Sequence, residues 1–251
     1  MHWEIEEIRR AILSKKMTIG LLIGFISMLY GGKYIIDSPN INFIDTFIFA
    51  QTDNTTAIIG LIFPILAVLP VGTSYRDEKS CGYYALLRSK MKRGRYLRIK
   101  LIVSALSGSV VIALPNLLFL ILVIIVKGIK INGESNVAIS FCTNIYFSSP
   151  LLYACLLIIN VAICGAIFSI LGMGISAWVK NKYLAMILPF AYYIFSGTVL
   201  YYINPWLNAI SLFCVNQYQV FNVFAVLLHD SILLLGGIVL FITGVKYEDK
   251  C

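Results

Sequence analysis

Long apolar stretches, separated by short polar segments, dominate this sequence. Of its 251 residues, 59% are hydrophobic and only 13% are charged, which is about half the charged fraction of ordinary soluble domains. A stretch of about 20 apolar residues is long enough for a helix to cross the hydrocarbon core of a bilayer. The sequence therefore predicts an all-α polytopic membrane protein, with a single transmembrane domain over residues 1–251.

The apolar stretches predict six transmembrane helices. They cover residues 17–36, 57–74, 101–126, 150–179, 183–200 and 223–245. Pro64 and Pro70 interrupt the second stretch, so we expect a kink there. In the fourth stretch, Gly165, Gly172 and Gly174 form a small-residue face that favours close packing against another helix.

The basic residues predict the orientation of these helices. Lys and Arg near transmembrane ends are retained on the cytoplasmic side, and 17 of the 20 basic residues lie in segments that six spans would place on one side. We therefore expect both termini in the cytoplasm. Because short loops between spans also account for the net charge of +8, we expect a lipid bilayer and no nucleic acid as partner.

Two further segments are expected at the membrane surfaces. Residues 1–16 predict an amphipathic helix, with Ile5, Ile8 and Ile12 on one face, that lies in the interface. Residues 201–222 carry six Asn and Gln side chains and no charge, so they are too polar to span and too apolar for a solvated loop. We expect a re-entrant helical hairpin, because polar backbone within the membrane has to be covered by protein.

Residues 37–56 are interpreted as an external loop. They contain three acids and no base, and their apolar middle, residues 41–50, is expected to rest on the membrane. Residues 127–149 form the second external loop. Cys142 and Cys214 fall on the outer side of this scheme, and the sequence leaves open whether they pair. No cluster of Cys and His has metal-binding spacing.

The stretch from Tyr75 to Lys100 is the only long polar run in the chain. It holds nine of the 20 basic residues and two of the 12 acids. Four apolar residues occur at i, i+3, i+4 and i+8, which places them on one helix face. They are Tyr83, Leu86, Leu87 and Met91. This face can lie on lipid or dock into a partner, or the loop can serve only to set the topology.

The order of residues in this loop resembles the first cytoplasmic loop of ABC-2 type transporter permeases. The matching positions are Glu78, Gly82, Leu87, Ser89, Arg93, Leu97 and Lys100. In that family the loop contains a coupling helix that sits in a cleft of a separate ATP-binding subunit. The proline usual in the family is missing here, where Lys90 and Met91 occupy that region.

The resemblance implies the membrane subunit of a type V-like ABC exporter in a cell membrane, expected to be a bacterial plasma membrane. Two permeases, identical or related, would work with two ATPase subunits that bind ATP and Mg, and the cargo would be amphipathic or lipophilic, such as a peptide, antibiotic or lipid. Residues implied to contact the ATPase are Glu78, Gly82, Tyr83, Leu86, Leu87, Met91 and Arg93. Residues expected along the substrate path are Asn208, Asn216, Gln217, His229 and Asp230.

The chain itself carries no P-loop, since the string Gly31-Gly32-Lys33 lacks the required upstream glycine. We therefore expect no bound cofactor and no ATP hydrolysis by this chain alone. Two alternatives remain. One is a membrane sensor or immunity protein that does not transport. The other is an intramembrane protease built on Ser176 and His229, which the six-span scheme separates by roughly 20–30 Å.

Overall fold

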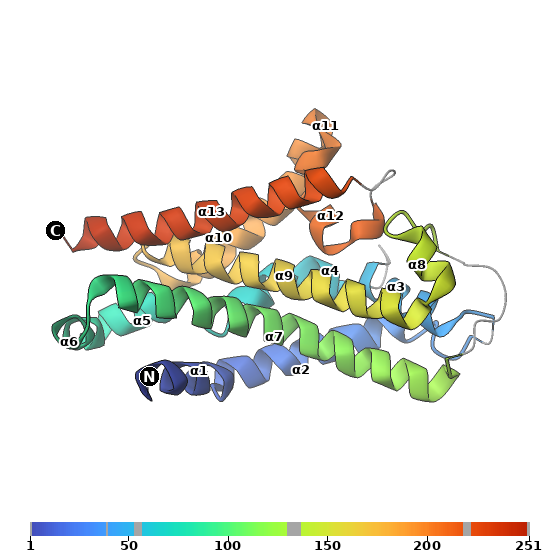
Figure 1. Cartoon of the computed structure of the whole chain (residues 1–251), viewed down its shortest axis with the longest axis horizontal. Helices are drawn as coiled ribbons and strands as arrows, with labels where there is room; N and C mark the ends of the chain where they lie inside the picture. The colour runs from blue at the N-terminus through green and yellow to red at the C-terminus, as the bar shows by residue number, and fades with distance from the viewer. Residues whose placement is uncertain (1, 39, 53–56, 130–136, 218–221, 250–251) are drawn as a thin grey trace.

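The structure is a computed structural model that describes residues 2–38, 40–52, 57–129, 137–217 and 222–249. It is helical and, over these residues, contains no strand. The longest helices lie side by side along the long axis of the molecule (Figure 1). They are α2 (Lys15–Gly32), α7 (Arg93–Lys127), α9 (Pro150–Ser176), α10 (Lys182–Phe195) and α13 (Val223–Glu248).

Four helical segments are long and apolar enough to cross a membrane. Three are α7, α9 and α13, and the fourth is α10 together with its continuation to Ile203. A fifth is obtained if α1 (His2–Ile12) and α2 count as one span bent by 45°. The polytopic membrane class is therefore supported by the lengths and composition of the helices.

The second expected span, residues 57–74, is not one helix of membrane length. Only α4, Ile58–Val68, is helical there, and its 11 residues extend about 16 Å, roughly half of the hydrocarbon core. Pro64 lies within this helix. The residues after Leu69 form turns before α5 begins at Ser74.

The first expected helix, residues 1–16, also ends earlier than predicted. α1 stops at Ile12, and Ser14 begins a new helix by accepting a hydrogen bond from the Met17 amide through its Oγ, at 3.1 Å. A side-chain cap of this kind satisfies a donor that the first turn leaves free. Lys15 and Lys16 therefore belong to α2, and the chain bends between α1 and α2.

α9 is the central helix, and its glycines allow three neighbours to approach closely. A Cβ atom added to Gly165 would lie 2.4 Å from the carbonyl oxygen of Gly108 on α7, and one added to Gly174 would lie 2.4 Å from that of Gly237 on α13. At Gly172 it would meet the side chain of Val68, which ends α4. The expected close packing is present, but it involves three helices and not one face.

The expectation that residues 41–50 rest on the membrane surface is wrong. α3, Phe43–Thr52, lies inside the bundle, and Asp45 is completely buried. Tyr146 donates a hydrogen bond to Asp45 Oδ1 at 2.6 Å, and Gln51 Nε2 donates to Asn116 Oδ1 at 2.6 Å. The polar side chains of this segment form hydrogen bonds within the protein, as buried polar groups generally do.

Lys127 closes the end of the bundle opposite the termini. Its ammonium group donates to three backbone carbonyls of the turn that follows α2, those of Ile35, Ser38 and Ile41, each at 2.9 Å. The short helix α8, Thr143–Ser148, lies at the same end (Figure 1).

Cys142 and Cys214 both carry free thiols in this structure. The Cys214 thiol is buried and makes a long contact, 3.9 Å, to the carbonyl oxygen of Gln51. Burial raises the pKa of the Cys142 thiol and raises that of Cys214 to about 12, so neither side chain is readily ionised.

Residues 201–217 form several short helical pieces, of which the first continues the span that begins with α10. They are α11 (Tyr201–Ile203), a 3₁₀ turn (Pro205–Leu207), α12 (Ile210–Phe213) and a second 3₁₀ turn (Val215–Gln217). α11 protrudes from the bundle (Figure 1). α12 is buried against α9, where Asn160 donates to the carbonyl oxygen of Leu212 at 2.8 Å.

Candidate functional site

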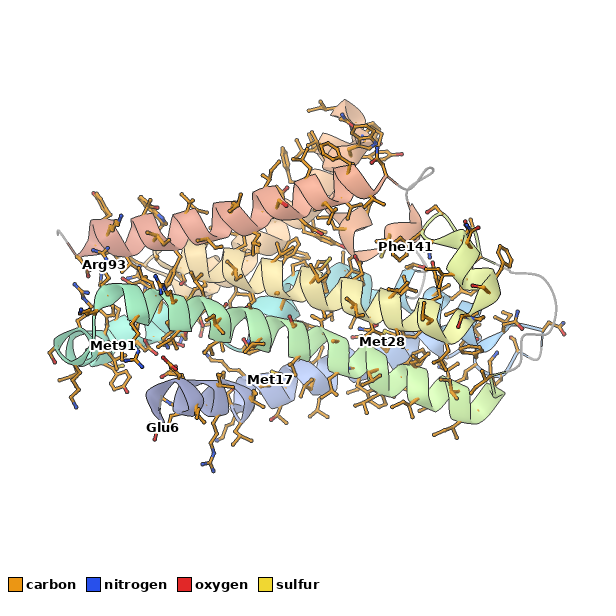
Figure 2. The ribbon with its side chains drawn as sticks, viewed as in Figure 1. Glu6, Met17, Met28, Met91, Arg93 and Phe141 are labelled. Carbon is orange, nitrogen blue, oxygen red and sulfur yellow. The ribbon has the colours of Figure 1, made fainter. Side chains whose placement is uncertain are left out.

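Both chain ends, α1, α5 (Ser74–Ser80) and α6 (Tyr83–Lys90) lie at the same end of the bundle (Figure 1). We call this the polar end, and it also includes the first turns of α7 and the last turn of α13. Figure 2 shows Arg93 and Met91 here and Phe141 near the opposite end. Most of the polar stretch from Tyr75 to Lys100 therefore gathers in one place.

The polar stretch folds as two short helices before α7. Gly82 separates α5 from α6 with φ of +75°, a left-handed conformation that glycine adopts without steric cost. Nothing lies within 4 Å of a Cβ added to Gly82, so the backbone angle and not crowding requires glycine. α6 ends at Lys90, and Met91 is extended, so Met91 lies outside the helix that was expected to carry it.

The residues of the predicted apolar stripe do not share one face of α6. The side chain of Leu87 is 5% exposed and packs in the core of the polar end, with Tyr83 and Met91 partly buried against that core. Leu86 is 62% exposed, because consecutive residues point about 100° apart on a helix. Leu87 was expected to contact a partner, but its side chain already packs within the chain, which leaves Leu86 on the outward face of α6.

Glu78 was also expected to contact a partner, and it is instead part of a buried ionic network. Lys100 is 1% exposed, and its Nζ donates to Glu78 Oε1 and, at 2.9 Å, to Glu7 Oε2 of α1. Tyr96 donates to the second oxygen of Glu78 at 2.8 Å, and Arg10 pairs with Glu7 at 3.2 Å. The network therefore joins α1, α5 and α7 with its charges balanced.

Glu248, in the last turn of α13, binds α5. Its carboxylate lies 3.1 Å from Arg76 Nη2 and 2.6 Å from Lys79 Nζ, and it accepts a hydrogen bond from Tyr75 at 2.7 Å. Burial and this carboxylate raise the pKa of Tyr75 well above its ordinary value. The end of α13 is thereby held against α5.

Asp249, the next residue, binds α6 and the start of α7. Tyr84 donates to Asp249 Oδ1 at 2.8 Å, while Arg88 and Arg93 each lie 3.5 Å from Oδ2. Burial, then the bond to Asp249, raises the pKa of Tyr84 above its ordinary value. Arg93, expected to contact a partner, is thus engaged within the chain.

Sequence reasoning missed Glu248 and Asp249. The available signal was two adjacent acids directly after an apolar span, in a chain whose central loop carries many more basic than acidic residues. The sequence could not show that Glu248 lies beside Tyr75 and Arg76, which are about 170 positions earlier in the chain.

The residues expected along a substrate path have separate structural contacts. Asn208 Oδ1 accepts a hydrogen bond from the Ile210 amide at 2.9 Å, just before α12. Asn216 Oδ1 accepts a hydrogen bond from Tyr153 at 3.0 Å. The side chain of Gln217 lies outside the described residues.

His229 Nε2 lies 3.0 Å from the Tyr192 hydroxyl of α10. Asp230, next to it on α13, has one buried carboxylate oxygen without a hydrogen bond in the described residues. In that same part of the chain, no hydrogen bond joins any two of the expected path residues. A shared site for these side chains therefore stays a prediction.

Ser176 and His229 do not form a catalytic pair in this structure. Ser176 donates to the Met173 carbonyl of its own helix at 2.7 Å, and His229 is bound to Tyr192. Gly174 contacts Gly237 across α9 and α13, and His229 lies eight residues before Gly237, about 12 Å along the helix. Ser176 and His229 are therefore too far apart for the hydrogen bond that a nucleophile and its base require.

No family model, curated protein or solved structure matches this chain. Among the described residues, no group of three or more His, Cys, Asp and Glu side chains is placed to hold a metal ion. The contacts at the polar end hold helices together. Its two ionic networks join the short helices α5 and α6 to α1, α7 and α13, and the outward face of α6 remains exposed.

Proposed function

We propose that this chain is the permease subunit of an ATP-driven ABC exporter and works with a separate ATP-binding subunit. The observation that carries the proposal is the attachment of α5 and α6 to two long helices: Asp249 joins α6 to α13, and Glu78, through Lys100, joins the preceding α5 to α7. A displacement of α6 is thereby transmitted to the bundle. ATP and Mg are bound by the partner.

The outward face of α6 supplies the contact with the ATPase in this proposal. Leu86, Ser89 and Lys90 are exposed, while the inward face is held by Leu87 and Tyr84. Because close-packed protein interiors are hardly compressible, movement of the ATPase against Leu86 is passed to α7 and α13. Both of these helices contact α9, which carries the motion into the middle of the bundle.

Six membrane passes with both termini in the cytoplasm belong to the same proposal. The pass through residues 57–74 combines α4 with the turns that follow it, and residues 201–222 enter the outer leaflet without crossing. Two permeases, identical or related, pair so that α2, α4 and α10 border the path. The exposed apolar side chains of α10, including Leu184 and Ile187, suit an amphipathic or lipophilic cargo such as a peptide, antibiotic or lipid.

The test is complex formation with a separate Walker-motif ATPase. A Walker-motif ATPase is sought among the genes adjacent to this one and co-expressed with the tagged chain, and the complex is purified and its subunit ratio is determined. We expect two permeases and two ATPases, with an ATPase rate that depends on the permease. Failure of the two proteins to associate would contradict export and favour a membrane sensor or immunity protein.

A further inference from the structure

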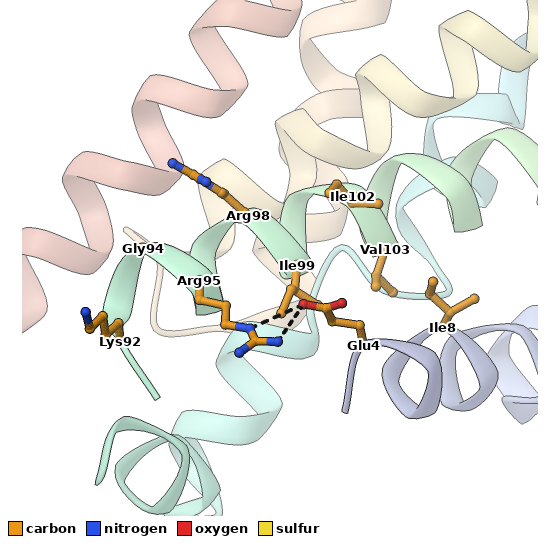
Figure 3. A pocket seen from close by; sticks show the side chains of 9 residues that line it. All are labelled: Glu4, Ile8, Lys92, Gly94, Arg95, Arg98, Ile99, Ile102 and Val103. Carbon is orange, nitrogen blue, oxygen red and sulfur yellow. Dashed lines mark hydrogen bonds and ion pairs between the residues drawn. The ribbon is translucent and has the colours of Figure 1, made fainter. Parts of the chain in front are cut away.

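A groove lies between α1 and the first turns of α7 (Figure 3). Its volume is about 780 Å³, within the range of roughly 300–1,000 Å³ that small-molecule sites occupy. Three basic residues line it, Arg95 and Arg98 of α7 and Lys92, which directly precedes α7, together with one acid, Glu4. Three positive charges against one negative leave a net charge of +2, and four aliphatic residues, including Ile102, complete the lining.

Most of the positive charge in the groove is available to a ligand. Lys92 and Arg98 are exposed, and in the part of the chain that the structure describes neither has an acidic partner. Arg95 extends toward Glu4 (Figure 3), with its Nη2 and Nε at 3.1 and 3.3 Å from one carboxylate oxygen. Both members of this pair are solvent-accessible, and exposed ion pairs of this kind are weak.

The face of α7 that carries this charge becomes apolar within two turns. Arg98, Ile102 and Leu106 follow one another at intervals of four residues, which places them on the same side of the helix. Ile102 and Leu106 are exposed apolar side chains. On α1, Ile5 and Ile12 are exposed as well, as an interfacial helix requires. The groove therefore has a basic end and an apolar end, as a site at the boundary between polar headgroups and acyl chains would require.

We infer that the groove binds one anionic phospholipid of the leaflet that surrounds the polar end. The phosphate lies at the basic rim, and an acyl chain follows Ile99 and Ile102. A guanidinium group matches phosphate oxygens better than it matches one carboxylate oxygen, so the headgroup displaces Glu4 from Arg95. A free anion would use only the basic rim and leave the aliphatic lining in water, which is why a lipid is favoured.

The experiment is native mass spectrometry of the full chain purified in mild detergent. It is titrated separately with dioctanoyl phosphatidylglycerol, with dioctanoyl phosphatidylcholine and with inorganic phosphate. We expect one phosphatidylglycerol per chain to be retained at concentrations where phosphatidylcholine is not. Inorganic phosphate at the same concentration should not displace it.

Matched variants separate the groove from general surface charge. Arg98→Gln should weaken phosphatidylglycerol binding about fivefold, as expected for one basic residue at an anionic membrane surface. Lys90→Gln removes the same charge from the outward end of α6 and should change binding little. Glu4→Gln should strengthen binding, because it releases Arg95, whereas Glu6→Gln, outside the groove lining, should not.

Three results would overturn the inference. They are equal retention of phosphatidylcholine, equal losses from Arg98→Gln and Lys90→Gln, or equal gains from Glu4→Gln and Glu6→Gln. Each would mean that lipid is attracted by overall charge or by the apolar surface, and not by this groove.

Discussion

Lys100 and Glu78 form a buried ion pair across the junction of α5 and α7, although 22 residues separate them in the chain. Glu7 of α1 is the second carboxylate on the same ammonium group. Neither acid has an exposed side chain, so water does little to replace a lost partner. The pair is therefore a fixed point for three helices at the polar end.

Lys100→Met should destabilise the protein strongly. It removes the cation from two buried carboxylates, and the loss of one partner from a buried pair costs about 3–5 kcal/mol. The measurement is thermal unfolding in detergent. Lys90→Met, an exposed control, should change the free energy of unfolding by less than about 0.5 kcal/mol. Similar midpoints for both variants would mean that the network contributes little.

Gly108→Ala should force α7 and α9 apart. The new Cβ would lie 2.4 Å from the carbonyl oxygen of Gly165, and overpacking of this kind costs about 1–3 kcal/mol. Gly236→Ala on α13 is the control, because nothing lies within 4 Å of its new Cβ. We expect a lower unfolding midpoint only for Gly108→Ala. An unchanged midpoint would contradict the close contact between these helices.

Tyr84→Phe should make stability less sensitive to alkaline pH. The pKa of Tyr84 is raised above 10 in the folded protein by burial and by Asp249, whereas in the unfolded chain it ionises near pH 10. Below pH 10 both states keep the proton. As pH rises above 10, the unfolded state loses it first, so folding is progressively disfavoured.

Unfolding midpoints measured from pH 8 to pH 11 test this expectation. The variant should be less stable than the native protein near neutral pH, because it loses a hydrogen bond to a carboxylate, worth about 1.5–3 kcal/mol. Its midpoint should then fall less steeply above pH 10. Tyr202→Phe, at an exposed position on α11, is the control, and the same slope in all three proteins would count against the Tyr84 assignment.

The long helices were predictable because burial in lipid and in protein both require apolar side chains. α9 and α13 begin at the predicted residues Pro150 and Val223. α7 begins at Arg93, eight residues before its predicted start at Leu101. Hydropathy excluded these first two charged turns of α7, although the side chain of Lys100 is buried, where it pairs with Glu78 and Glu7.

α3 and α4 were not predictable from the same signals. Acidic residues without bases favoured an external loop for residues 37–56, but Asp45 is buried by its hydrogen bond with Tyr146, 101 residues away. The helical part of residues 57–74 ends at Val68, before Pro70 and Gly72. Long-range pairing and the exact helix end depend on neighbours that the local sequence does not contain.

The polar end was only partly predictable. A helix is present in the polar stretch, but the predicted apolar stripe is not one face of it, because Met91 lies outside α6 and Leu86 is exposed. Periodicity also does not say whether an apolar side chain contacts a partner or the chain itself. Leu87 proved to be inward. Sequence spacing also gave no reason to place Asp249 beside Tyr84, 165 residues earlier.

The sidedness of the protein can be tested by thiol labelling of intact cells. Cys81 is exposed at the polar end between α5 and α6, and Phe147 is exposed on α8 at the opposite end. One variant retains only Cys81, and the other has Phe147→Cys as its only cysteine. An impermeant maleimide should label position 147 in sealed cells and Cys81 only after permeabilisation. Labelling of Cys81 in sealed cells would place the polar end outside.

The most direct test of the permease proposal is recovery of the ATPase with Leu86→Asp. Leu86 is 62% exposed on α6, and Ile129 is 58% exposed beyond the far end of α7, so neither substitution disturbs a buried side chain. An aspartate at position 86 would bring an unpaired charge into an apolar contact, which is costly.

The tagged native chain, Leu86→Asp and Ile129→Asp are each co-expressed with the Walker-motif ATPase, and the ATPase bound per permease is measured. We predict full recovery with the native chain and with Ile129→Asp, and recovery reduced at least tenfold with Leu86→Asp. Equal recovery of the ATPase with all three, or none with the native chain, would contradict the assignment of α6 as the coupling helix.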